Sequence, residues 1–111
     1  MRPGEIYLAQ FPFGDVPGMK LRPVLLLTWA IGPIPEVLVA YISSVIPSSS
    51  LPSDLTIDPT KLRSTNLKTL STLRLHKLAT IHSSSLTRYL GNIDSATFAI
   101  VSTKLRALLA L

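Results

Sequence analysis

The stretch GMKLRPVLLL, residues 18–27, joins a glycine-bearing loop to an apolar strand through an Arg-Pro step. Because Pro23 disfavours a helical conformation at Arg22 and is tolerated only near the start of a strand, we expect a strand to begin here. Arg22 then stands as a fixed cation beside a loop over 14–20, as a phosphate-binding arginine would. The alternative is that Arg22 only caps a strand end in water, because arginines are mostly solvated.

Apolar runs on both sides of this stretch predict further strands. The runs 24–29 and 37–42 are aliphatic or β-branched without helical spacing, and a Gly-Pro-Ile-Pro segment joins them. They are therefore expected to be adjacent antiparallel strands. Similar patterns predict strands over residues 5–11, 55–57, 73–81 and 86–93, with Gly91 as a possible bulge in the last of these.

The segment 73–81 alternates sharply between two faces. Successive side chains of a strand point to opposite sides, so Arg74 and His76 are expected to share a face. This places the imidazole beside a second candidate phosphate-binding arginine.

A helix is expected over 95–109. Asp94 precedes it as an N-cap, and apolar residues recur at helical spacing from Phe98 to Leu109. Five or six short strands and one C-terminal α-helix predict a mainly β fold, a small antiparallel barrel with the helix packed on it. At 111 residues the chain is expected to form a single domain over 1–111.

The composition points to a polyanionic partner and to a protein interface. Lys and Arg outnumber Asp and Glu by 11 to 6, and the pI is near 10.0, which favours nucleic acid as a partner. Charged residues make up only 15% of the chain and apolar residues 47%, so we expect a buried interface, most simply that of a homodimer.

The chain has no cysteine and two histidines, which excludes a disulfide framework and a thiolate metal site and leaves too few ligands for a zinc cage. This suits the reducing cytoplasm. The apolar residues 24–46 are interrupted by Gly32, Pro33, Pro35 and Glu36, so no membrane span is expected, and the N-terminus lacks a signal-peptide pattern.

Six motifs then occur in an order that resembles the MazF/PemK family of toxins. They are PGEIYL (3–8), RPVLLL (22–27), VAYIS (39–43), LPSDLTI (51–57), RLHKLATI (74–81) and LRALLAL (105–111). The resemblance implies an SH3-like antiparallel β-barrel of the MazF/PemK/CcdB type, a homodimer, and inhibition by a cognate antitoxin. It also implies sequence-specific cleavage of single-stranded RNA without a metal or other cofactor.

The resemblance also implies site residues. Arg22 matches the family's loop arginine, and Ser43 matches a threonine or serine at the end of the third strand. Arg74 matches an arginine of the later strand, but His76 stands where the PemK branch has an aspartate. Ala79 stands where MazF-type members have a further arginine.

The chemistry can be argued from the residues themselves. Cleavage of RNA by its own 2′-OH requires a base for that hydroxyl, an acid for the leaving oxygen and a cation for the phosphorane charge. His76 can act as base or acid near neutral pH, and we hypothesise that it replaces the family's carboxylate. Arg22 and Arg74 would bind the phosphate, and Ser43 would hydrogen-bond a phosphate oxygen or the 2′-OH. The alternative for His76 is a strand histidine satisfied by local hydrogen bonds.

Other candidates carry less weight. Lys20 and Lys77 would line an RNA groove, or are simply solvated. Trp29 and Tyr41 could stack on bases, but their apolar strand runs favour core or dimer contacts. His82 precedes three serines in an expected turn, and the chain lacks the G-x-S-x-G nucleophile elbow of a serine hydrolase.

Three functions therefore remain open. The first is an endoribonuclease toxin with Arg22, Ser43, Arg74 and His76 as its site. The second is a nuclease-inactive module that binds RNA or an antitoxin. The third is a protein-targeting inhibitor of a topoisomerase, as in toxins of the CcdB type, although the basic charge and the two arginines favour RNA.

Overall fold

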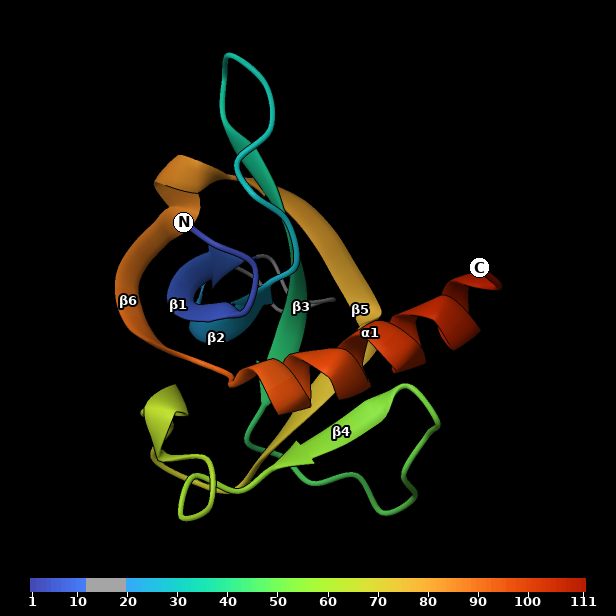
Figure 1. Ribbon diagram of the computed structural model, residues 1–111. Coiled ribbons are helices and arrows are strands. Elements are labelled where there is room, and N and C mark those ends of the chain that lie inside the picture. The colour runs from blue at the N-terminus through green and yellow to red at the C-terminus, as the bar shows by residue number, and fades with distance from the viewer. Residues whose placement is uncertain (12–19) are drawn as a thin grey trace.

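The computed structural model describes residues 1–11 and 20–111 (Figure 1). Except for Lys20, the loop expected over 14–20 lies outside the described residues. Six strands are present: β1 (Glu5–Phe11), β2 (Lys20–Leu26), β3 (Glu36–Ser43), β4 (Asp54–Ile57), β5 (Ser71–His82) and β6 (Leu86–Asn92). Two 3₁₀ turns, η1 (Arg63–Thr65) and η2 (Ser83–Ser85), and one helix, α1 (Ser95–Leu109), complete the chain.

All the strand pairs are antiparallel and form one sheet in the order β4-β5-β3-β2-β1-β6. The sheet curls strongly, and α1 crosses it (Figure 1). The expected mainly β class with a C-terminal helix is confirmed. The sheet is not a closed barrel, however, because within the described residues β4 and β6 end the strand order and do not pair with each other.

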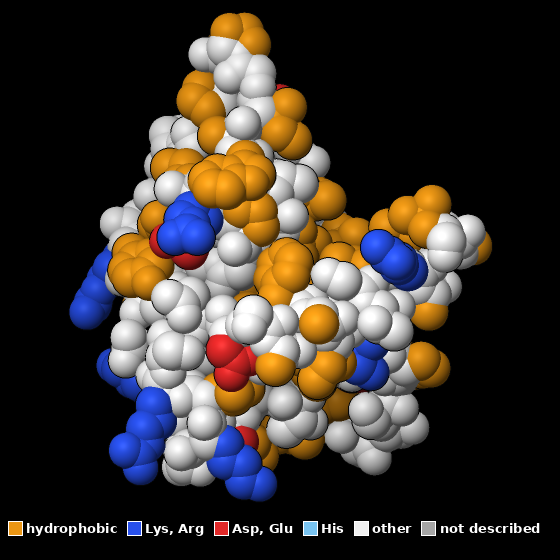
Figure 2. Space-filling view, viewed as in Figure 1, with side chains coloured by type: hydrophobic (Ala, Val, Ile, Leu, Met, Phe, Trp, Pro, Cys, Tyr) orange, Lys and Arg blue, Asp and Glu red, His pale blue; other side chains and the backbone are white. Residues whose placement is uncertain are grey.

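The strands predicted around residues 24–42 pair as expected, but β2 ends early. Leu26 pairs with Val39, and the Thr28 hydroxyl then accepts the Leu38 N–H at 3.1 Å, in place of a backbone carbonyl. The strand ends there, and Trp29 is 61% exposed. Of the two predictions made for Trp29, the core contact is therefore wrong, and the dimer contact stays a prediction. The hairpin after Trp29 projects from the body, and Figure 2 shows apolar side chains over its tip.

The sheet buries apolar residues on both faces. One cluster lies under α1 and includes Ile6, Leu25, Ile42 and Leu73. A second cluster lies on the opposite face near the hairpin. Its buried members are Ala9, Val24, Leu26, Val37 and Val39.

The predicted N-cap of α1 is confirmed, because Asp94 accepts the Thr97 N–H at 2.7 Å. Hydrogen bonds from the side chain and backbone of Thr97 lower the pKa of the Asp94 carboxyl. Val101 is buried and Phe98 packs on the core, but Leu109 is 51% exposed. The apolar face predicted for the helix therefore meets the core only along its first three turns.

A glycine is needed at position 91 because the backbone of η1 lies very close to it. A side chain there would collide with the backbone carbonyl of Ser64 in η1. The bulge itself falls one residue earlier: Gly91 pairs with Ile6 and Tyr89 with Tyr7, which leaves Leu90 as the extra residue. Among the described residues, α1 included, no helix is long and apolar enough to cross a membrane.

Candidate active site

The candidate residues lie along a row that crosses four strands. Asp54 pairs with Arg74, Arg74 with Tyr41, and Tyr41 with Val24. Directly opposed residues of antiparallel strands share a face, and so do residues two apart on one strand. Arg22 and Ser43 therefore lie on the same face as the row. With strands about 4.8 Å apart and about 3.4 Å per residue, the Cα atoms of Arg22 and Arg74 are roughly 12 Å apart.

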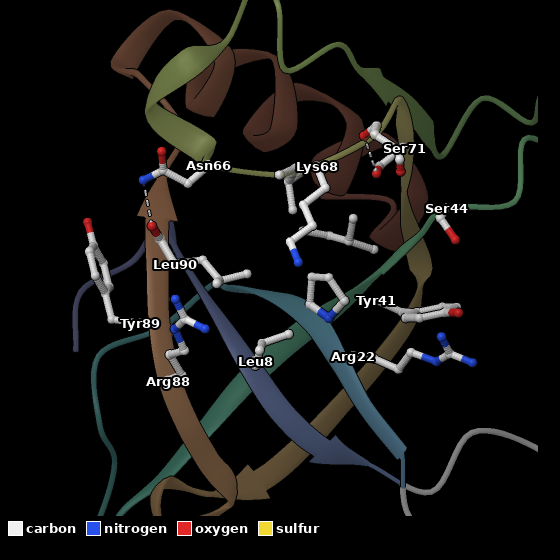
Figure 3. Close-up of a pocket in the computed structure, with 14 residues that line it drawn as sticks. Leu8, Arg22, Tyr41, Ser44, Asn66, Lys68, Ser71, Arg88, Tyr89 and Leu90 are labelled. Carbon is white, nitrogen blue, oxygen red and sulfur yellow. Dashed lines mark hydrogen bonds between the residues drawn. The ribbon is translucent and has the colours of Figure 1, made fainter.

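Arg22 lies on β2, two residues before Val24, the last residue of this row. It is half-buried in β2 immediately before Pro23, opposite Ala9 of β1. The part of the chain that the structure describes offers it no acidic partner within ion-pair distance. In Figure 3 its guanidinium lies on the same side of the site as the Tyr41 ring, directed away from the sheet. As far as the described residues go, its donors are available to an anion.

Ser43 ends β3 and is buried, with 7% of its surface exposed. Its hydroxyl oxygen accepts the Val45 N–H at 3.1 Å, which fixes the turn after the strand. The hydroxyl proton is not used in that bond, so Ser43 keeps a donor.

Arg74 and His76 come together on one face of β5, as predicted. An Arg74 Nη2 atom lies 3.4 Å from His76 Nε2. Ala40 of β3 pairs with Leu78 of β5, and the next residue, Tyr41, pairs with Arg74. Residues 75–77 of β5 therefore have no partner on β3, and His76 lies in a bulge that turns it outward. Its side chain is 28% exposed and can meet a ligand.

An acid completes this cluster, and sequence reasoning missed it. The Asp54 side chain is only 1% exposed, and its Oδ1 lies 2.7 Å from Arg74 Nε and 4.0 Å from His76 Nδ1. The neighbouring Ser53 places its hydroxyl 2.9 Å from His76 Nδ1. The motif LPSDLTI displays both residues, but only the pairing of β4 with β5 shows which residues they meet.

A cavity of about 450 Å³ lies on the opposite face of the sheet from the row and reaches the row at Arg22 and Tyr41 (Figure 3). Leu8, Pro23 and Ile42 give it an apolar floor, and Lys68 extends its amine into it. Arg88 points toward the same space from β6, and Arg22 and Tyr41 lie at the rim. The cavity combines an apolar floor with cations, as a site for a nucleotide would.

The remaining candidates lie near the edges of the site. Lys20 is exposed at the start of β2, and the Lys77 amine lies 5.8 Å from the centre of the Tyr41 ring. His82 is exposed at the end of β5, opposite Glu36. Within residues 1–11 and 20–111, no three His, Asp or Glu side chains gather as a metal site would require. Figure 2 shows further Lys and Arg side chains along the side of the molecule that carries β6 and η1.

The sequence matches a family model described as PemK-like, MazF-like toxin of type II toxin-antitoxin system, over residues 2–109. The chain belongs to this family. The resemblance drawn from the six motifs is thereby confirmed. The match covers all six strands and all of α1.

Solved structures with the same fold include members of this family. The toxin MazF-mt6 of Mycobacterium tuberculosis is 23% identical, with 96% of this chain and 97% of that chain covered and a TM-score of 0.75. A mycobacterial endoribonuclease in complex with its cognate antitoxin is 19% identical, with 100% and 96% covered and a TM-score of 0.72. In the MazE–MazF structure from Deinococcus radiodurans, the matching chain is 15% identical, with 99% and 95% covered and a TM-score of 0.67. A search of curated proteins finds no match.

Proposed function

We propose that this MazF/PemK-family toxin is an endoribonuclease that cleaves single-stranded RNA at specific sequences by attack of the 2′-OH, without a metal. The observation that carries the proposal is the row itself: Arg22, Arg74 and His76 share one face, and Arg74 touches His76 at 3.4 Å. Two cations and an imidazole on one surface supply the charge stabilisation and the base that this reaction requires.

Each residue has a distinct part in the reaction. His76 takes the proton of the 2′-OH, O2′ forms its bond to phosphorus, and the bond from phosphorus to the 5′-oxygen breaks. The departing 5′-oxygen takes a proton from water, which regains one from the His76 imidazolium, and the other product is a 2′,3′-cyclic phosphate. Arg22 and Arg74 stabilise the charge that develops on the phosphorane, and the Ser43 hydroxyl donates to a phosphate oxygen.

The cavity beside Arg22 supports a role in substrate binding. It is large enough for one nucleotide, and its cations Lys68 and Arg88 suit the neighbouring phosphates. Lys20, two residues before Arg22 on β2, and Lys77, over the Tyr41 ring, add positive charge near the row. Because single-stranded RNA is read through splayed bases, this hollow is where sequence preference would arise.

The proposal includes the partners that the family suggests. We propose that the toxin acts in the cytoplasm as a homodimer and is inhibited by a cognate antitoxin. Two of the similar structures are named as complexes of this kind, an endoribonuclease with its cognate antitoxin and MazE–MazF. The basic chain, with a net charge of +5, suits both RNA and an acidic antitoxin segment.

The test is incubation of the purified protein with a long single-stranded RNA in EDTA, followed by mapping of the fragment ends. We expect discrete fragments, lost in Arg22→Ala and His76→Ala and retained in the control His82→Ala. Removal of one donor to the transition state is expected to slow cleavage by about 100-fold or more. Intact RNA, under conditions in which the folded protein binds it, would overturn the nuclease and leave a nuclease-inactive binding module.

A further inference from the structure

The buried carboxylate of Asp54 lies against two candidate site residues of β5, Arg74 and His76. Resting on the proposed function, we propose that Asp54 and Ser53 are positioning residues. Asp54 holds Arg74, and Ser53 orients His76 with its proton on Nδ1. Nε2 is then the ring's acceptor: it accepts from Arg74 in the free protein, and it becomes the base when the substrate phosphate draws that guanidinium nitrogen away. The family's PemK branch has an aspartate where this chain has His76. Here a carboxylate, that of Asp54, would act from the adjacent strand β4 by holding Arg74 and His76 rather than by contacting the substrate.

The contacts of His76 determine which ring nitrogen carries the proton. A guanidinium can only donate hydrogen bonds, so the 3.4 Å contact from Arg74 Nη2 makes His76 Nε2 the acceptor. In the neutral ring the proton is then on Nδ1, which donates to the Ser53 hydroxyl oxygen at 2.9 Å. A negative charge 4.0 Å from Nδ1, on Asp54 Oδ1, favours the same tautomer.

The Asp54 carboxylate also contacts Arg74. Asp54 Oδ1 and Arg74 Nε are 2.7 Å apart, but their geometry is that of an ion pair without an aligned hydrogen bond. Among the described residues, neither atom has another hydrogen-bond partner. The interaction is therefore one of opposite charges in a buried place. It anchors the Nε end of the guanidinium and leaves the Nη2 end, 3.4 Å from His76, able to turn to a phosphate.

The turn that carries both residues is pinned on several sides. The Leu51 N–H donates to Asp54 Oδ2 at 2.9 Å, and the Asp54 N–H donates to the Leu51 carbonyl at 2.9 Å. The Ser53 carbonyl accepts the Leu75 N–H at 3.0 Å, which ties the turn to β5. Lys104 of α1 donates to the Pro52 carbonyl at 3.0 Å. A rigid support of this kind is what a positioning residue needs to hold a base in one orientation.

The decisive experiment observes the imidazole directly. Nitrogen NMR spectra of isotope-labelled protein carrying His82→Gln contain the signals of one histidine, His76, whose ring nitrogens distinguish the two tautomers. We expect the Nδ1–H form in this background. Ser53→Ala and Asp54→Asn should each shift the population toward the Nε2–H form, and the control Ser84→Ala should not.

The same variants are assayed for RNA cleavage. Ser53→Ala and Asp54→Asn should reduce kcat about tenfold or more, because a base in the wrong tautomer loses much of its contribution. Ser53→Thr, which keeps the hydroxyl, should restore both the tautomer and the rate. If Asp54→Asn does not fold, the pair Ser53→Ala and Ser53→Thr still decides.

Two outcomes would overturn the inference: the Nε2–H form in the unsubstituted background, or a tautomer that Ser53→Ala leaves unchanged. These are separate from failure of the proposed function. An inactive protein whose His76 shows the Nδ1–H form, dependent on Ser53, would refute the nuclease and leave the positioning intact. An active protein with the other tautomer would refute the positioning alone.

Discussion

Arg22 and Arg74 lie on the same face of one sheet and are held in opposite ways. Arg22 depends on its backbone, because Pro23 and the pairing with Ala9 fix its place and no described carboxylate holds its guanidinium. Arg74 depends on a buried partner, the Asp54 carboxylate at 2.7 Å. Among the described residues, the guanidinium of Arg22 thus has no ion-pair partner, whereas that of Arg74 is fixed by one. Preorganisation in this site is concentrated at β5.

The largest expected difference between the two arginines is in folding stability. Arg74→Met leaves the Asp54 carboxylate buried without its cation and should lower the free energy of unfolding by about 3 kcal/mol. Arg22→Met removes no buried partner and should change it by less than about 0.5 kcal/mol. Urea denaturation measures both. Equal losses would contradict the comparison, and addition of Asp54→Leu to Arg74→Met should recover much of the stability.

A smaller difference should appear when both arginines are replaced by lysine. Arg74 uses Nε toward Asp54 and Nη2 toward His76, and a lysine cannot make both contacts. We expect Arg74→Lys to lower kcat by about 30-fold, the equivalent of one lost charged hydrogen bond. Arg22→Lys keeps a cation for the phosphate and should lower kcat only about fivefold.

The control for the lysine pair is the salt dependence of RNA binding. Both lysine variants keep the charge, so the slope of the binding constant against salt concentration should not change. A greater loss of kcat at Arg22 than at Arg74 would place the preorganised cation on β2 instead.

The smallest expected difference concerns the two lysines that flank these arginines. Lys77 lies over the Tyr41 ring at 5.8 Å, and Lys77→Ala should lower the free energy of unfolding by about 0.5 kcal/mol. Lys20→Ala, at the exposed start of β2, should have no measurable effect on stability. Thermal unfolding of the two variants, measured side by side, tests this, and a larger loss in Lys20→Ala would show that the β2 end is held more firmly than described.

Local patterns in the sequence predicted the strands, the N-cap at Asp94 and the shared face of Arg74 and His76. Alternation and capping are properties of neighbouring residues, so no tertiary knowledge was needed. The strand predicted over 24–29 ends sooner, and Trp29 is not in the core, because the Thr28 hydroxyl substitutes for the backbone after Leu26. Asp54 was missed because its partner is 20 residues away, and only the register of β4 against β5 identifies it.

The contact of Lys104 with the Pro52 carbonyl has a consequence for the timing of synthesis. The two residues are 52 positions apart, so a nascent chain completes the support beneath Ser53 and Asp54 only after most of α1 has been translated. Strand β1 likewise pairs with β6 only after residues 86–92 have emerged from the ribosome, and such long-range pairings form late in folding. A ribosome-bound chain shorter than this carries Arg22, Arg74 and His76 without their final scaffold. In a toxin of this design, the candidate active site is the last part of the molecule to reach its final structure.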